Sequence, residues 1–319
     1  MRRLRQTPVL RRLVAEVELS VNDLVAPLFV REGIDEPAPI HSLPGVVQHT
    51  QESLRKEVHR LAELGIPAVI LFGVPANQDP EGSEAWSPDG VAQVALRNLR
   101  HDLGDDVVIM ADLCLDEYTS HGHCGIVDEN GRVDNDLTLD LYANVAVAQA
   151  EAGAHVVAPS GMMDGQVLAI RDALDEAEFE QVSILAYSAK YASAFYGPFR
   201  DAVDVTIADG GDRRGYQQDW RNGREALEEI RLDLSEGADM VMIKPAMSCL
   251  DVIARARAEV DVPIAAYHVS GEYAMLKAAA ENGWIDGEAA ALEQLTAIKR
   301  AGADFILTYL SGELAPRLR

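Results

Sequence analysis

The stretch Ser235-Glu236-Gly237-Ala238-Asp239-Met240-Val241-Met242-Ile243-Lys244 carries the pattern from which the fold is inferred. Its glycine stands where a helix needs a left-handed C-terminal cap, and a short apolar run follows at once. The same junction recurs at 151–155 (Glu-Ala-Gly-Ala-His) and at 300–304 (Arg-Ala-Gly-Ala-Asp). Such junctions predict helices that alternate with short buried strands.

Eight apolar, β-rich runs of this kind are spread along the chain: Val25–Val30, Ala68–Phe72, Val107–Met110, His155–Ala158, Ser183–Tyr187, Met240–Ile243, Pro263–Tyr267 and Phe305–Leu310. Stretches with helical periodicity, such as Leu54 to Gly65, lie between them. Continuously apolar strands separated by helices indicate a parallel sheet buried on both faces. The eightfold count predicts one (β/α)₈ TIM barrel over residues 23–319. An open doubly wound sheet is the alternative, but no Gly-x-Gly-x-x-Gly follows an early strand.

The N-terminal segment, residues 1–22, is basic, whereas the chain as a whole is acidic. Five arginines precede the first acidic residue: Arg2, Arg3, Arg5, Arg11 and Arg12. We expect an extended arm whose partner is a second copy of the chain. A solvated, disordered tail is the alternative.

Charge and composition exclude several classes of protein. Lys+Arg 28 against Asp+Glu 52 gives a net charge of −24, which argues against binding to nucleic acid or to an anionic membrane. No apolar run has the length of about 20 residues that a membrane helix needs. Three cysteines give no disulfide framework, and the N-terminus lacks the apolar core of a secretory signal. We therefore expect a cytoplasmic protein.

Two lysines each end an apolar run. Lys190 closes the run that begins at Ser183, and Lys244 closes the run that begins at Met240. Burial disfavours an ammonium ion and lowers the pKa of a lysine, and a second ammonium nearby acts in the same direction. A neutral amine attacks a ketone to form a Schiff base, so we predict that both lysines are catalytic. Solvated or ion-paired lysines at strand ends are the alternative.

The loop after the third predicted strand offers metal ligands. Cys114 and Cys124 are soft donors, and Asp116, His121 and His123 are further donors. Two thiolates with one nitrogen or oxygen ligand and a water would form an open, catalytic zinc site. Buried thiols beside loop histidines are the alternative.

Residues 191–222 form a second long stretch without a clear helix or strand, and Arg200 and Arg213 lie in it. A guanidinium group is well suited to a substrate carboxylate, although pairing with the plentiful acids is equally compatible with the sequence. Ser270 and Tyr309 follow two later strands and are candidates to bind a second carboxylate. Taken alone, each is more often a structural hydroxyl.

Several segments together resemble one enzyme family. They are Glu117–Gly125, Met163–Gln166, Tyr187–Arg200, Lys244-Pro245, Val269–Met275 and Lys299–Asp304. The chain resembles porphobilinogen synthase, also called delta-aminolevulinic acid dehydratase, from Leu4 to Leu310. Phe195–Arg200 and Val269–Ala274 are the most specific strings.

The resemblance implies a (β/α)₈ barrel with an N-terminal arm, assembled as a homo-octamer. It implies a lyase that condenses two 5-aminolevulinate molecules to porphobilinogen, with loss of water, in heme biosynthesis. A metal is implied, and no organic cofactor.

The resemblance also assigns roles by position. Lys190 and Lys244 match the lysines that form Schiff bases with the first and the second substrate. The residues that match contacts to the two substrates are Arg200 and Arg213 for the first, and Ser270 and Tyr309 for the second. Glu229 matches the position at which some bacterial members bind an allosteric magnesium ion.

The metal loop departs from the family pattern. Zinc-dependent members carry three cysteines, whereas this chain has Cys114, Asp116 and Cys124. We expect these residues to bind zinc, more weakly than three thiolates would. Two other functions fit the residues without the resemblance: a class I aldolase-like barrel, which needs only one such lysine, and an inactive metal-sensing or scaffold barrel.

Overall fold

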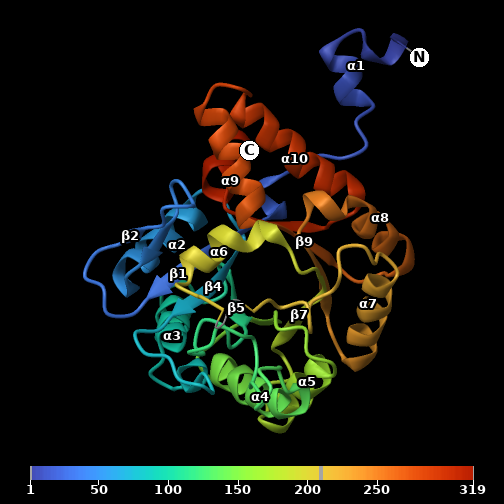
Figure 1. Ribbon diagram of the computed structural model, residues 1–319. Coiled ribbons are helices and arrows are strands. Elements are labelled where there is room, and N and C mark those ends of the chain that lie inside the picture. Colours follow the sequence, from blue (N-terminus) through green and yellow to red (C-terminus); the bar gives the residue numbers. More distant parts are fainter. Residues whose placement is uncertain (1, 208–210, 319) are drawn as a thin grey trace.

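The computed structural model describes residues 2–207 and 211–318 and contains a closed parallel barrel (Figure 1). Neighbouring strands follow the order β10-β9-β8-β7-β6-β5-β4-β1, and β1 pairs with β10 to close the ring. The barrel strands are β1 (Leu24–Arg31), β4 (Ala68–Val74), β5 (Val108–Leu113), β6 (Val156–Pro159), β7 (Ser183–Lys190), β8 (Met240–Lys244), β9 (Ile264–His268) and β10 (Phe305–Thr308). Closure confirms the predicted TIM barrel and excludes the open sheet.

Helices surround the strands on the outside (Figure 1). They are α2 (Gln51–Glu63), α3 (Val91–Leu103), α4 (Asn135–Glu151), α5 (Gln166–Glu176), α7 (Glu225–Glu236), α8 (Leu250–Glu259), α9 (Ser270–Glu281) and α10 (Gly287–Ala301). Gly237 ends α7 with a φ of 110°, as its junction predicts. Within the described ranges, no helix combines the length and the apolar character that crossing a membrane requires.

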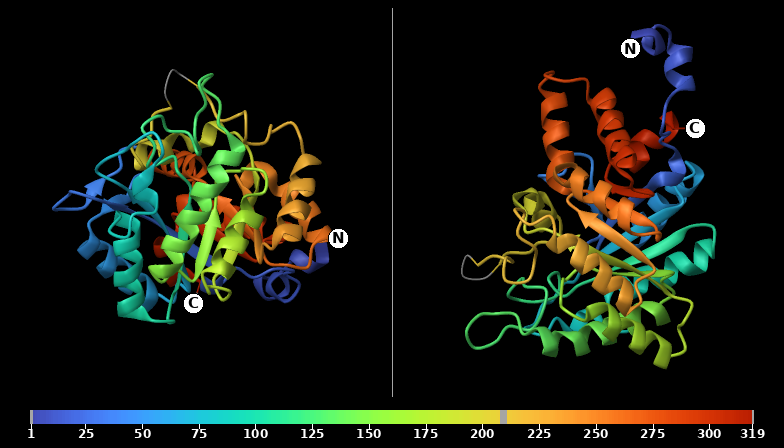
Figure 2. Two further views of the ribbon diagram at one scale, coloured as in Figure 1. Left: turned by 90° about the horizontal axis from the view of Figure 1, so that it is seen from below. Right: turned by 90° about the vertical axis from the view of Figure 1, so that its right-hand side faces the viewer.

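The N-terminal segment lies away from the barrel in Figures 1 and 2. It contains the 3₁₀ turn η1 (Arg2–Arg5) and the helix α1 (Pro8–Leu13), neither of which has a buried residue. The Thr7 hydroxyl accepts a hydrogen bond from the Leu10 N–H and caps α1. The short turn η2 (Val21–Asp23) then leads into β1.

Some elements differ from the expectation. A small hairpin of β2 (Ala38–Pro39) and β3 (Val47–His49) pairs with β1, and it is too short to leave an apolar pattern. The stretch 191–222 is not a plain loop, because it contains η4 (Ala194–Tyr196) and α6 (Gly197–Ala202). The remaining short elements are η3 (Ser83–Ala85), η6 (Met247–Cys249), α11 (Ser311–Leu314) and η7 (Ala315–Arg317).

Candidate active site

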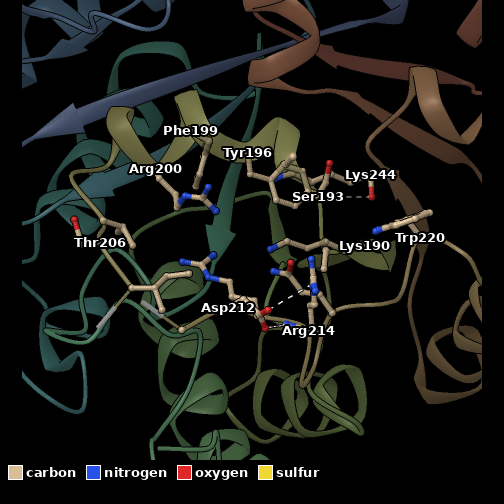
Figure 3. Close-up of a pocket in the computed structure, with 17 residues that line it drawn as sticks. Lys190, Ser193, Tyr196, Phe199, Arg200, Thr206, Asp212, Arg214, Trp220 and Lys244 are labelled. Atoms are coloured by element: carbon tan, nitrogen blue, oxygen red, sulfur yellow. Dashed lines mark hydrogen bonds and ion pairs between the residues drawn. The ribbon is translucent and has the colours of Figure 1, made fainter. Parts of the chain in front are cut away.

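A cavity of about 580 Å³ opens at the carboxyl ends of β7 and β8 (Figure 3). Active sites of TIM barrels lie at this end of the strands. The residues around the cavity include Lys190, Lys244, Arg200, Arg213 and Gln217. In Figure 3 the Lys190 amine and the Arg200 guanidinium point into the space between β7 and α6. The structure therefore brings together four of the residues selected from the sequence.

Lys244 is enclosed by aromatic rings and only 4% exposed. The distances from its Nζ atom to the ring centroids are 4.4 Å for Tyr267, 5.0 Å for Phe199, 5.1 Å for Tyr196 and 5.2 Å for Tyr187. Burial, and then the charge of Lys190, lowers the pKa of Lys244 to about 7. A large fraction of this amine is therefore neutral near neutral pH, as the sequence predicts.

Lys190 is equally buried but differs in charge. Its Nζ donates to the carbonyl oxygen of Ser160. Burial acts to lower the Lys190 pKa, but the acidic groups that face this amine, Cys124, Cys114 and Asp116, together outweigh burial and raise the pKa above its ordinary value. The prediction that both lysines are neutral is therefore wrong for Lys190, because acidic groups that are distant in sequence face this amine.

The predicted metal ligands form one buried cluster. One ligand atom from each of Cys114, Asp116 and Cys124 lies within 4.8 Å of the other two. Two sulfurs and a carboxylate oxygen form a donor set that suits zinc and leaves room for a further ligand. The two histidines are not part of this cluster. His121 Nε2 lies 3.0 Å from the Pro80 carbonyl oxygen, and His123 contacts a tyrosine hydroxyl.

The charge of the cluster comes mainly from Asp116. Burial opposes ionisation of this carboxyl, but the Arg213 guanidinium lowers its pKa below the ordinary range. Arg213 Nη1 lies 2.7 Å from Asp116 Oδ2. Burial raises the pKa of the Cys114 thiol well above its ordinary value. The cluster thus contains a carboxylate that is already paired with a cation.

Two residues that line the cavity beside the lysines carry buried donors without partners. Arg213 Nε and Gln217 Nε2 are both buried and have no hydrogen-bond partner among the described residues. Arg200 lies near them and is half-buried; burial and the neighbouring Arg213 charge lower its pKa. These groups form a site for an anion such as a carboxylate. Sequence reasoning missed Gln217, because an amide in a loop follows no recognisable pattern.

Ser270 and Tyr309 do not line this cavity. The Ser270 hydroxyl accepts from the Phe199 N–H at 3.0 Å and lies 3.2 Å from the Phe195 carbonyl oxygen, to which it donates. The Tyr309 hydroxyl lies 3.2 Å from the hydroxyl of Tyr267. Ser270 is therefore hydrogen-bonded to Phe199 and Tyr309 lies against Tyr267, and both of these partners belong to the aromatic residues that enclose Lys244.

Two more acids lie near the lysines and were not selected as site residues. Ser160 donates to Asp112 Oδ2 at 3.0 Å, whereas Asp112 Oδ1 has no partner within the described ranges. Glu117 is 2% exposed, and burial raises its pKa well above the ordinary value. Asp112 closely follows the apolar run Val107–Met110, but nothing in the sequence indicated that the Glu117 carboxyl is buried.

Glu229 borders a different cavity, of about 1070 Å³, which Asp164 and Glu225 also line. Burial, and then the charge of Asp164, raises the pKa of Glu229. The structure therefore gathers acids around Glu229, apart from the lysine cavity.

Comparisons with known proteins agree with this geometry. The sequence model of the family described as "Delta-aminolevulinic acid dehydratase" matches residues 1–316. The delta-aminolevulinic acid dehydratase of Streptomyces coelicolor is 58% identical over 320 residues, which cover 100% of this chain and 96% of that protein. The Mycobacterium tuberculosis protein of the same name is 60% identical over 316 residues, which cover 98% and 95% of the two chains.

A solved structure is similar over the whole fold. The Toxoplasma gondii delta-aminolevulinic acid dehydratase, in complex with the reaction product porphobilinogen, superposes with a TM-score of 0.97 at 45% identity. The match covers 99% of this chain and 90% of that chain. On these grounds the chain belongs to the delta-aminolevulinic acid dehydratase family.

Proposed function

We propose that this chain condenses two molecules of 5-aminolevulinate to porphobilinogen, with loss of water, through Schiff bases on Lys190 and Lys244. The observation that carries the proposal is the pair of buried amines in one cavity beside Arg200 and Arg213. Two keto acids held side by side on two amines turn a bimolecular condensation into a positioned reaction. The chain is then a dehydratase of heme biosynthesis.

Of the two lysines, Lys244 is the one whose amine is already in large part deprotonated near neutral pH and ready to attack a ketone. Its pKa of about 7 leaves much of it neutral, and the surrounding rings exclude water from the imine that forms. We assign this imine to the second substrate. The first substrate then forms its imine on Lys190, whose amine must first lose a proton.

Asp112 is placed to orient a substrate amino group. Its free Oδ1 is a buried acceptor close enough to Lys190 and Lys244 to influence both charges. The Ser160 hydroxyl fixes the other oxygen of the carboxyl group. A buried acceptor without a partner favours a ligand that brings a donor.

The substrate carboxylates bind on opposite sides of the lysines in this proposal. Arg200 and Arg213, which both line the cavity, take the carboxylate of the first substrate. Ser270 and Tyr309 take the second: Ser270 turns its hydroxyl hydrogen from the Phe195 carbonyl oxygen to the substrate, and Tyr309 offers the hydroxyl that now contacts Tyr267.

We propose that Cys114, Asp116 and Cys124 hold a zinc ion, because their three donors lie within reach of one another. When bound, zinc supplies Lewis-acid polarisation of a substrate carbonyl or amine. A carboxylate is a harder donor than the thiolate it replaces, so the site holds zinc less tightly than three cysteines do. Glu229, with the acids near it, is the proposed site of an activating magnesium ion.

The assembly is also part of the proposal. We propose a cytoplasmic homo-octamer whose dimers are held by the arm of residues 1–22. Leu4, Val9 and Leu13 are exposed in the arm together with its arginines, and a partner surface would cover both. The net charge of −24 supplies acidic surface for such contacts.

The test is reductive trapping with 5-aminolevulinate, followed by peptide mapping. Borohydride should link the substrate to Lys190, Lys244 or both. An aldolase-like barrel or an inactive scaffold should not be labelled by this substrate. Labels found only at other lysines would exclude the proposed function.

A further inference from the structure

Arg213 joins the metal cluster to the substrate cavity. Its Nη1 lies 2.7 Å from Asp116 Oδ2, and its Nη2 donates to the Gly122 carbonyl oxygen at 2.8 Å. The exposed fraction is 9% for the Arg213 side chain and 4% for that of Asp116. Solvent and salt screen such a pair far less than a surface pair, so the guanidinium is held in one orientation.

The Arg213 side chain lines the cavity that contains both lysines. Its Nε is buried without a partner in the part of the chain that the structure describes. The same is true of Gln217 Nε2, and both residues line the cavity that contains Lys190 and Lys244. Buried donors without partners cost free energy, and an incoming carboxylate would satisfy them.

We propose that Asp116 is a positioning residue for the substrate carboxylate as well as a metal ligand, because it holds the Arg213 side chain in place at the cavity wall. This inference rests on the proposed function. Removing the Asp116 carboxylate would leave Arg213 fixed only by the Gly122 carbonyl, and the guanidinium would no longer keep one orientation.

The ion pair between Arg213 and Asp116 also positions the Asp116 carboxylate. Arg213 fixes the Asp116 carboxylate beside Cys114 and Cys124, as outer hydrogen bonds commonly orient metal ligands. A carboxylate has two oxygens, so it can face a guanidinium and a cation together, whereas a thiolate offers a single atom. The affinities for a cation and for a substrate carboxylate are therefore linked through one ion pair.

The first experiment measures the carboxylate side without any metal. The chelated protein is incubated with levulinate, which is the substrate without its amino group, and imines are trapped with cyanoborohydride. Asp116→Asn should raise the half-saturating levulinate concentration by about tenfold, within the usual range of coupling between sites. Asp212→Asn is the matched control: it removes a carboxylate at the same cavity that pairs with Arg214 and not with Arg213, so its half-saturation should match the wild type.

The second experiment measures the metal side without substrate. Cobalt(II) is titrated into the protein and followed by its absorption bands. Arg213→Gln should weaken cobalt binding by about 10- to 100-fold, as loss of an outer-shell partner does. Arg200→Gln removes the other cavity guanidinium and should leave cobalt affinity unchanged.

A double variant tests whether Asp116 and Arg213 act on the carboxylate as one unit. In Asp116→Asn/Arg213→Gln, the loss of levulinate affinity should be smaller than the sum of the losses in the two single variants.

The outcomes separate the inference from the proposed function. If the wild type is labelled by levulinate and Asp116→Asn is labelled equally well, the positioning role is overturned and the proposed function stands. If Arg213→Gln binds cobalt as tightly as the wild type, the proposal that Arg213 positions Asp116 as a metal ligand is overturned. Failure of levulinate to label the wild type at Lys190 or Lys244 would overturn the proposed function and this inference with it.

Discussion

Lys190 and Lys244 are register partners at the ends of the parallel strands β7 and β8. A register shift between Ala186 and Ala189 inserts one extra residue into β7 before the lysine. Side chains alternate between the two faces of a strand, so without this bulge Lys190 would stand one position out of step with Lys244. The bulge thus turns both amines toward one cavity, where the charge of Lys190 contributes to the low pKa of Lys244.

The pKa of Lys244 predicts how its labelling depends on pH. A lysine with a lowered pKa becomes nucleophilic above that lower value, so trapping of levulinate at Lys244 should rise with a midpoint near pH 7. Between one pH unit below and one above this midpoint, the neutral fraction rises about tenfold. Initial rates of cyanoborohydride labelling, resolved by peptide mapping, measure this. A midpoint close to that of a solvated lysine would contradict the assignment.

Replacement of Lys190 tests its covalent role. Lys190→Arg keeps the positive charge, but a guanidinium does not form the imine, so turnover should fall by at least about a thousandfold. Lys56→Arg is a matched control, because Lys56 is an exposed residue on α2 that pairs with Glu52. Its turnover should match the wild type. Porphobilinogen production by the Lys190 variant within tenfold of wild type would show that this lysine is not covalent.

The sequence predicts the barrel because buried parallel strands leave a clear pattern. The eight runs are predominantly apolar, and capping glycines mark several of the helix ends that precede them. Lys190 and Lys244 were found for the same reason, since a charge directly after an apolar run is conspicuous.

What the sequence could not supply depends on how loops fold back over the barrel. Arg213 was a candidate either for a substrate carboxylate or for pairing with an acid, but nothing in the sequence indicated that its partner is Asp116 of another loop. The raised pKa of Lys190 has the same origin, because its acidic neighbours are distant in sequence. Neither contact produces a periodic pattern in the sequence from which it could have been predicted.

The arm should control assembly. Removing residues 1–12 should shift the protein to smaller assemblies and lower its activity, because none of residues 2–12 is buried against the rest of the chain. A full-length variant with the five arginines replaced by glutamine separates charge from length: a similar shift would assign the effect to charge. Sedimentation velocity measures both. An unchanged mass after truncation would make the arm a simple tail.

Zinc binding should depend on the thiolates of Cys114 and Cys124. Cys124→Ala should lose both zinc and activity, whereas Asp116→Cys should bind zinc more tightly, because a thiolate is a softer ligand than a carboxylate. Cys249→Ala is the control, since this thiol is packed at the start of α8, outside the cluster. Metal analysis and activity after exhaustive chelation and zinc add-back are the measurements. Full activity in the stripped enzyme, together with an active Cys124→Ala, would rule out a catalytic zinc.

Asp233, in the middle of α7, should make stability depend on pH. The residue is 8% exposed, and burial raises its pKa to about 7, although a hydrogen bond with Ser188 acts the other way. The charges of Glu236 and Glu229 raise the pKa further. Because the folded pKa lies above the unfolded one, the folded protein binds the extra proton. Its contribution to stability is complete below about pH 4 and is lost as the pH rises to about 7.

Asp233→Asn removes this titration and keeps the shape of the side chain. Relative to wild type, its stability should increase from pH 5 to pH 8, by at most about 4 kcal/mol, the free energy that the pKa difference corresponds to. Thermal unfolding midpoints of both proteins, compared at equal concentration across this range, measure the effect. Asp140→Asn, an exposed substitution on α4, should follow the wild-type curve. A difference between Asp233→Asn and wild type that stays constant with pH would show that the Asp233 carboxyl is ionised in the folded protein throughout.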